Sequence, residues 1–134
     1  MIIAFSKKKI INNKKYSNLN KDIFNFNKQI VKKKNNVKKF IKNNKNKIYV
    51  YGASSQVNDL INVYGVKEKF IIRILDTDPK KTFFKIPSLP KTKIEFINEF
   101  NFKKNYGIII CTASHSKVNK ILNKYNHSGQ RFYL

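Results

Sequence analysis

The chain has 134 residues, 41% of them apolar, and a formal net charge of +22. This length favours a single domain with a modest core. No apolar run approaches the roughly eighteen residues that a membrane helix needs, and the first residues have neither the order nor the length of a signal peptide. Because Cys111 is the only cysteine, no internal disulfide can form, and we expect a cytoplasmic protein.

The positive charge comes almost entirely from lysine, since Arg73 and Arg131 are the only arginines. Recognition of bases and phosphates favours the planar, forked guanidinium of arginine. Lysine charge without that fork predicts non-specific, salt-sensitive contacts with polyanions. A basic nucleic-acid-associated protein is kept as one alternative.

The N-terminal part of the chain changes character near Asp22. Residues 1–21 sustain no apolar period of 2 or 3.6 residues, which predicts a basic, disordered tail. From residue 22 the apolar residues recur at spacings of three, four and seven, which predicts an amphipathic helix over residues 22–42 that packs on a sheet. Asn20 or Asp22 can cap its start. The expected domain therefore covers residues 22–134.

Three apolar runs near 48–51, 71–75 and 107–111 have the composition of buried strands. Helical segments separate them, and this alternation predicts an α/β domain with a small parallel sheet, preceded by the helix. The expected segments between and after these strands are helices over 56–65, 95–100 and 117–124 and a last short strand within 128–134.

In parallel sheets of this kind, ligands bind beyond the carboxyl ends of the strands. Gly52 forms a tight turn after the first strand, but its single glycine matches neither a dinucleotide fingerprint nor a P-loop. Ser54 and Ser55 follow in this turn. Their hydroxyls can cap the next helix, or its free N–H groups can hold a phosphate.

The ends of the other two strands carry further candidates. Asp76 ends the second strand, where an acidic residue can accept hydrogen bonds from a ribose. Cys111 and His115 follow the third strand at a spacing that suggests a nucleophile and a base, but no acid stands nearby, and a buried thiol is the ordinary interpretation. Ser114 or Ser116 can cap the next helix. Two histidines and one cysteine, without a carboxylate cluster, predict no metal site.

The run from Tyr51 to Gly65 resembles the Gly-Tyr-Gly-Ala-Ser-Ala-Lys-Gly-Asn-Thr segment that opens the C-terminal Rossmann-like domain of the sugar C-methyltransferases. The segment 76–81 is similar to the family's Asp-Arg-Asn-Pro-x-Lys, and the proline loop 87–90 stands where the family has Pro-Gly-Thr-x-Ile-Pro. The ending 129–132 is similar to its Gly-Gly-Lys-Phe. The resemblance covers about residues 22–134, with Gln-Val in place of the family's Lys-Gly.

The resemblance implies a Rossmann-like domain that contributes to nucleotide-sugar binding. The expected substrate-binding residues are Gly52, Ser54, Ser55, Asn58, Asp76 and His115, with no catalytic residue assigned. Family members carry a zinc-binding module and an S-adenosylmethionine domain, whose cysteine cluster and glycine-rich loop this sequence lacks. We therefore expect a detached C-terminal domain or subunit that binds no cofactor and does not methylate alone.

In this view, a methyltransferase partner chain brings S-adenosylmethionine, and the ligand of this chain is a nucleotide sugar or another phosphorylated sugar. The alternative from another class is a Rossmann-like nucleotide-sugar binding module of a polysaccharide-modifying enzyme. We expect no contact with a membrane.

Overall fold

A computed structural model describes the backbone of residues 2–134 and the side chains from residue 16 onward. The chain divides into two units, residues 1–33 and residues 34–134. Within the described residues, no helix is both long enough and apolar enough to cross a lipid bilayer.

The first element is the helix α1, Ile2–Asn43. It begins at Ile2, not near Asn20 or Asp22 as predicted. The reason is that the first glycine of the chain is Gly52 and the first proline Pro79, so nothing before Asn43 forces the helix to break. The expected disorder of residues 1–21 stays a prediction, which amide hydrogen exchange tests. The side chains of residues 1–15 lie outside the described part of the structure.

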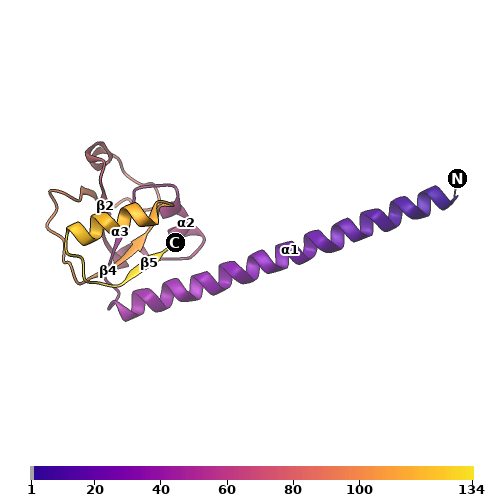
Figure 1. Cartoon of the computed structure of the whole chain (residues 1–134), viewed down its shortest axis with the longest axis horizontal. Helices are drawn as coiled ribbons and strands as arrows, with labels where there is room; N and C mark the ends of the chain where they lie inside the picture. Colours follow the sequence, from indigo (N-terminus) through magenta and orange to yellow (C-terminus); the bar gives the residue numbers. More distant parts are fainter. Residues whose placement is uncertain (1) are drawn as a thin grey trace. The chain divides into compact units, whose positions relative to one another are not determined.

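The sheet has five strands, all paired in parallel, in the order β3-β2-β1-β4-β5. Figure 1 labels β2, β4 and β5 of this sheet. The strands are β1 Ile48–Tyr51, β2 Ile71–Asp76, β3 Ile94–Phe96, β4 Gly107–Ile110 and β5 Arg131–Tyr133. This arrangement confirms the predicted parallel α/β fold and the positions of its three main strands. The strand order is that of a Rossmann-type sheet, in which the chain adds β2 and β3 on one side of β1 and then β4 and β5 on the other, with all strands parallel.

Four helical segments lie between the strands. They are the α-helices α2, Gln56–Asn62, and α3, His115–Lys124, and the short 3-10 helices η1, Glu68–Phe70, and η2, Pro79–Phe83.

The segment 95–100 forms no helix, which corrects the prediction. Its apolar residues have helical spacing, but Ile94 pairs with Ile74 on β2, and Glu95 makes an ion pair with Arg73 at 3.3 Å. Strand pairing and this cross-strand ion pair therefore override the local pattern.

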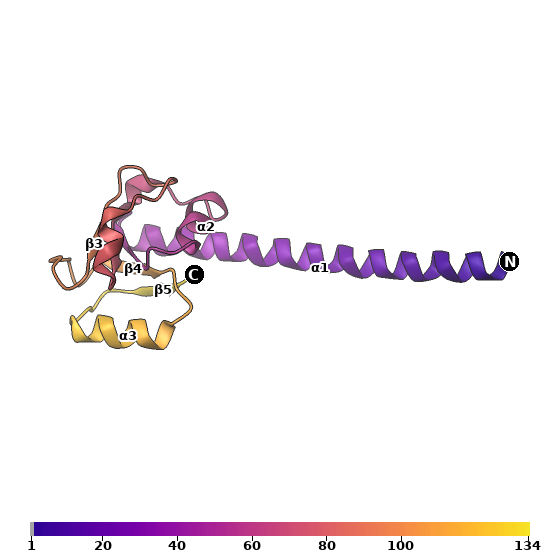
Figure 2. The same cartoon turned by 90° about the horizontal axis from the view of Figure 1, so that it is seen from above.

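Both faces of the sheet are covered, because all four residues of β1 are buried. Ile48 and Val50 belong to one apolar cluster, and Tyr49 and Tyr51 belong to another. Figure 2 shows α2 and α3 on opposite sides of the strands. The first cluster also holds Val37, Phe40 and Ile41 of α1 with Val57 and Leu60 of α2, and the second holds Val118 and Leu122 of α3. Burial on both faces explains why these strands are continuous apolar runs.

Arg131 joins the edge strand β5 to α3. Its guanidinium donates to the side-chain oxygens of Asn119 and Asn123, at 2.9 and 2.7 Å, and to Nδ1 of His127 at 3.3 Å. Nε2 of His127 lies 2.8 Å from the carbonyl oxygen of Tyr106. Burial lowers the pKa of His127 and the charge of Arg131 lowers it further, although the Tyr106 carbonyl favours the protonated ring. His127 is therefore neutral near pH 7, with the proton on Nε2.

Candidate functional site

A cleft of about 170 Å³ lies at the carboxyl ends of β1, β2 and β4. The segments that follow these three strands meet around it, beside the point where the strand order reverses. Its lining residues are Tyr51, Gly52, Ser54, Asp76, Thr77, Lys81, Thr112, Ser114, Lys117, Val118 and Ile121.

Gly52 lines the cleft and sets the path by which the chain leaves β1. Its φ of +95° lies in the region that favours glycine. A Cβ at this position would stand 2.9 Å from the carbonyl oxygen of Cys111. The Gly52 N–H donates to the Leu75 carbonyl at 2.8 Å, and the Cys111 N–H donates to the Tyr51 carbonyl at 2.8 Å. Glycine therefore lets the chain leave β1 while staying in close contact with both neighbouring strands.

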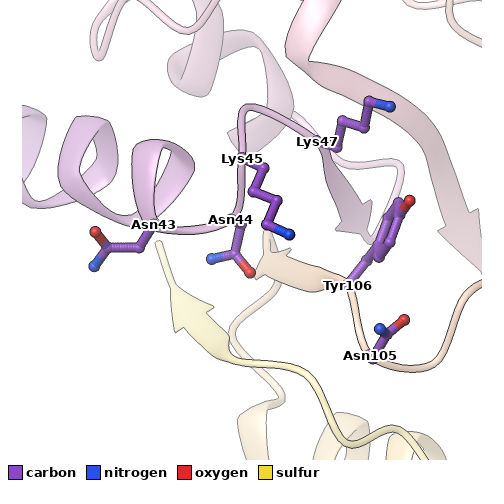
Figure 3. A pocket seen from close by; sticks show the side chains of 6 residues that line it. All are labelled: Asn43, Asn44, Lys45, Lys47, Asn105 and Tyr106. Carbon is purple, nitrogen blue, oxygen red and sulfur yellow. The ribbon is translucent and has the colours of Figure 1, made fainter.

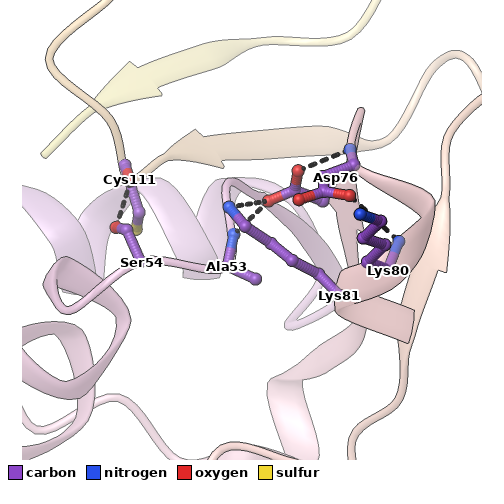
Figure 4. A network of polar contacts seen from close by, with 7 residues as sticks. Ala53, Ser54, Asp76, Lys80, Lys81 and Cys111 are labelled. Atoms are coloured by element: carbon purple, nitrogen blue, oxygen red, sulfur yellow. Dashed lines mark hydrogen bonds and ion pairs between the residues drawn. The ribbon is translucent and has the colours of Figure 1, made fainter. Parts of the chain in front are cut away.

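Asp76 ties two of the loops together (Figure 4). Its carboxylate accepts hydrogen bonds from the backbone N–H groups of Ala53, at 2.8 Å, and Asp78, at 2.9 Å. The ammonium of Lys81 completes the network at 3.0 Å. Burial alone would raise the pKa of Asp76, but the Asp78 and Ala53 N–H groups and Lys81 together hold it below its ordinary value. Asp76 is therefore an ionised group that orders the cleft from within.

Tyr51 points a second ionisable group toward this region. Burial raises the pKa of its phenol, and the negative charge of Asp76 and the nearby Tyr125 raise it further, while a hydrogen bond with the Thr77 side chain opposes the change. The phenol consequently stays protonated at neutral pH and can donate a hydrogen bond.

The serines of the Gly52 turn do not cap α2 as the sequence suggested. Ser55 stands at the N-cap position, but its side chain makes no capping hydrogen bond. Ser54 instead donates from Oγ to the carbonyl oxygen of Cys111 at 2.6 Å (Figure 4). Its backbone N–H donates to the carbonyl of Gly52. Ser54 therefore links the loop after β1 to the loop after β4.

Three of the six predicted binding residues, Gly52, Ser54 and Asp76, line the cleft, and the other three do not. Ser55 stands at the N-cap of α2, where it is exposed. Asn58 accepts a hydrogen bond from Ser88 Oγ at 2.8 Å, which ties α2 to the proline loop. The His115 ring packs against the Tyr133 ring, with centroids 4.7 Å apart. Asn58 and His115 therefore lie outside the lining of this cleft, and their part in ligand binding stays a prediction.

The sequence interpretation missed two lysines at this cleft. Lys81 and Lys117 both line it, and they bring positive charge to a place where the predicted residues offered only hydroxyls and a carboxylate. Among 27 lysines, composition gave no reason to choose these two. The signal that was present is their position, since Lys81 follows β2 closely and Lys117 lies in the first turn of α3. Cys111 is fully buried, so it cannot act as a nucleophile on a ligand in the cleft.

A larger cavity, of about 380 Å³, lies near the amino ends of β1 and β4. Figure 3 shows the side chains that line it. Its lining residues are Asn43, Asn44, Lys45, Lys47, Asn105 and Tyr106. Asn44 donates from Nδ2 to the Phe40 carbonyl and to Gln130 Oε1, at 2.9 and 3.2 Å. This cavity is therefore part of the junction between the end of α1 and the amino ends of β1 and β4, where parallel sheets do not normally bind ligands.

The described residues contain no group of three or more histidine, cysteine, aspartate or glutamate side chains that could hold a metal ion. The cleft offers hydroxyls, two ammonium groups and one ionised carboxylate. This set can bind a polar, anionic ligand through hydrogen bonds and charge.

The sheet order and the position of the cleft define a Rossmann-like α/β domain. A family model described as the C-methyltransferase C-terminal domain matches residues 7–134. The chain belongs to this family, as the resemblance in its sequence indicated. No curated protein and no solved structure gives a significant match.

Proposed function

We propose that this chain supplies the substrate-binding domain of an S-adenosylmethionine-dependent sugar C-methyltransferase. Its ligand is a nucleotide sugar or another phosphorylated sugar, held at the cleft beyond β1, β2 and β4. The observation that carries the proposal is the meeting of Gly52, Asp76 and Lys117 at the switch point of a sheet that belongs to a C-methyltransferase family.

The chemistry of the lining suits such a ligand. The ammonium of Lys117 and the hydroxyls of Thr112 and Ser114 suit a phosphate, which prefers cations and hydroxyl donors. The Asp76 carboxylate already accepts three hydrogen bonds, and an ionised carboxylate offers about four acceptor positions. One position therefore remains for a sugar hydroxyl.

The size of the cleft limits what it encloses. Pockets that bury a whole small ligand usually measure about 300–1,000 Å³, whereas this cleft has about 170 Å³. It suits one phosphate group or one sugar ring, and the rest of a nucleotide sugar would extend beyond the cleft.

Methyl transfer needs S-adenosylmethionine and a catalytic base, and no residue of this cleft is assigned that role. In our proposal a partner chain supplies both, and this domain positions the sugar. The partner completes the enzyme and this chain binds no cofactor of its own.

The test is isothermal titration calorimetry of the chain with a panel of nucleotide sugars and sugar phosphates, with and without a methyltransferase partner. We expect Lys117→Gln to weaken binding about tenfold, because it removes one charged contact. Lys120→Gln is the matched control, since it removes the same charge from α3 at a residue outside the cleft. The proposal is wrong if no panel member binds under either condition, or if the two variants weaken binding equally.

A further inference from the structure

The lining of the cleft includes a phenol that the sugar contacts described so far do not use. Tyr51 is the last residue of β1, lines the cleft, and is 5% exposed. Its ring belongs to the apolar cluster that also holds Val118 and Leu122 of α3. Packing within this cluster fixes where the phenol oxygen lies, so this polar group is held in place before a ligand arrives.

The Tyr51 phenol has a proton to offer to a ligand. Burial raises the pKa of the phenol, and a hydrogen bond with the Thr77 side chain opposes this rise, as a donor to the phenol oxygen does. When Thr77 donates to the phenol oxygen, the proton of the phenol is left for another acceptor. Because the phenol keeps this proton at neutral pH, Tyr51 is a hydrogen-bond donor in the cleft.

Asp76 supplies an acceptor near this donor. It ends β2, and in the parallel pairing of β1 with β2 it lies one residue beyond the partner of Tyr51. Oδ2 of Asp76 accepts from the Ala53 N–H and from Lys81, whereas Oδ1 accepts from the Asp78 N–H. A second acceptor position on Oδ1 is therefore open to a ligand. Burial raises the pKa of the Tyr51 phenol and the negative charge of Asp76 raises it further, which is the effect of a carboxylate that lies close to the phenol.

A donor and an acceptor in one small cleft suit a hydroxyl group of a ligand. The oxygen of an alcohol accepts a hydrogen bond and its proton donates one, so a single hydroxyl satisfies Tyr51 and Asp76 together. A ketone or ether oxygen only accepts, and an ionised phosphate is repelled by the charge of Asp76. Because the cleft has a volume of only about 170 Å³, a sugar ring inside it lies within reach of both side chains.

The two lysines of the cleft select less sharply than the phenol. The Lys81 side chain is 37% exposed and its ammonium contacts Asp76 at 3.0 Å, and Lys117 is exposed on α3. An ammonium on a flexible side chain attracts acceptors from many directions, and charged ones most strongly. The buried phenol of Tyr51 cannot turn to follow a ligand, so the position of the ligand hydroxyl is determined there.

We propose that Tyr51 is a specificity-determining residue, which together with Asp76 selects one hydroxyl group of the bound sugar. This inference rests on the sugar-binding function proposed above, and it adds which group of the ligand is recognised and by which pair of side chains. Removal of the phenol oxygen should therefore change which sugars the cleft prefers, while the ring of residue 51 keeps its place in the core.

The probes are glucose 1-phosphate and UDP-glucose, each compared by calorimetry with analogues that lack one sugar hydroxyl. The native chain should bind one of these analogues about 25-fold more weakly than its parent, because two hydrogen bonds of about fivefold each are lost. Tyr51→Phe should bind the parent about fivefold more weakly than the native chain does, and that analogue equally well. Its preference for the parent should therefore fall to about fivefold.

The matched control is Tyr49→Phe. Tyr49 lies on the same strand and in the same apolar cluster, and it is 3% exposed. Its hydroxyl accepts a hydrogen bond from the Lys103 N–H at 3.2 Å, outside the lining of the cleft. This replacement removes the same buried group from β1 and should keep the preference of about 25-fold. Thermal unfolding verifies that both variants keep their fold.

Three results would overturn the proposal. If Tyr51→Phe weakens binding of the parent and of every analogue equally, the phenol only orders Thr77 and does not contact the sugar. If the native chain binds every analogue as well as the parent, no hydroxyl is selected. If neither glucose 1-phosphate nor UDP-glucose binds, this inference is wrong, whereas the proposed function is wrong only if its whole panel of nucleotide sugars and sugar phosphates also fails to bind.

Discussion

Replacing Gly52 by alanine tests whether the close approach of β1 and β4 shapes the cleft. The new Cβ would stand 2.9 Å from the Cys111 carbonyl oxygen, a backbone atom that cannot move without disturbing β4. The φ of +95° adds a second penalty. Left-handed backbone costs a non-glycine residue about 1–2 kcal/mol, and overpacking costs about 1–3 kcal/mol. We therefore expect Gly52→Ala to lower the free energy of unfolding by about 2–5 kcal/mol.

Gly65→Ala provides the control that separates these two terms. Gly65 also has positive φ, at +69°, but a Cβ at this position would meet only the end of the flexible Lys34 side chain, at 3.5 and 3.6 Å. Gly65→Ala should therefore lower the free energy of unfolding only by the cost of the left-handed backbone, about 1–2 kcal/mol. Urea unfolding followed by circular dichroism measures both variants, provided that the dependence on urea is unchanged. If Gly52→Ala costs no more than Gly65→Ala, the contact with the Cys111 carbonyl does not constrain the turn.

Three further outcomes are expected. Asp76→Asn should destabilise the domain by about 1–3 kcal/mol, since it weakens a charged, buried hydrogen-bond network. Because the folded pKa of Asp76 is lowered from 3.8, the stability that the carboxylate contributes is present above pH 3.8 and lost as the pH falls through the folded value. Acid unfolding of the native chain and of the variant checks this. His127 has a folded pKa below 6.5, so the native chain should lose stability as the pH falls below 6.5. Thermal unfolding between pH 5 and 8 measures this loss, which His127→Gln should remove and the control His115→Gln should retain. Binding to random DNA duplexes should collapse between low and physiological salt, and fluorescence anisotropy that shows a sequence preference at physiological salt would contradict this.

The sequence allowed the main strands to be predicted because a parallel strand covered on both faces is a continuous apolar run, as in Ile108–Ile110. The strand Ile94–Phe96 was not recognised, because its three residues become a strand only through pairing with β2. Local sequence carries no record of that distant partner.

The candidate site was predictable at the level of loops but not of side chains. Topology alone brings the segments after β1, β2 and β4 to one edge. Which side chain faces the cleft depends on where each helix begins, because successive side chains of a helix point in directions about 100° apart. His115 and Lys117 are two residues apart in the first turn of α3, and this difference directs the histidine to Tyr133 and leaves the lysine at the cleft.

The hydrogen bonds of Arg131 have a consequence for how the domain opens. Strand β5 has only three residues and lies at the edge of the sheet, so its backbone pairing with β4 is a weak attachment by itself. The guanidinium reaches two residues of α3 through two different nitrogens in a fixed plane, a geometry that the single nitrogen of a lysine does not have. We therefore expect helix α3 and the C-terminal strand to behave as one cooperative unit. Their amide protons should exchange with solvent together, as a single opening event rather than as two independent ones.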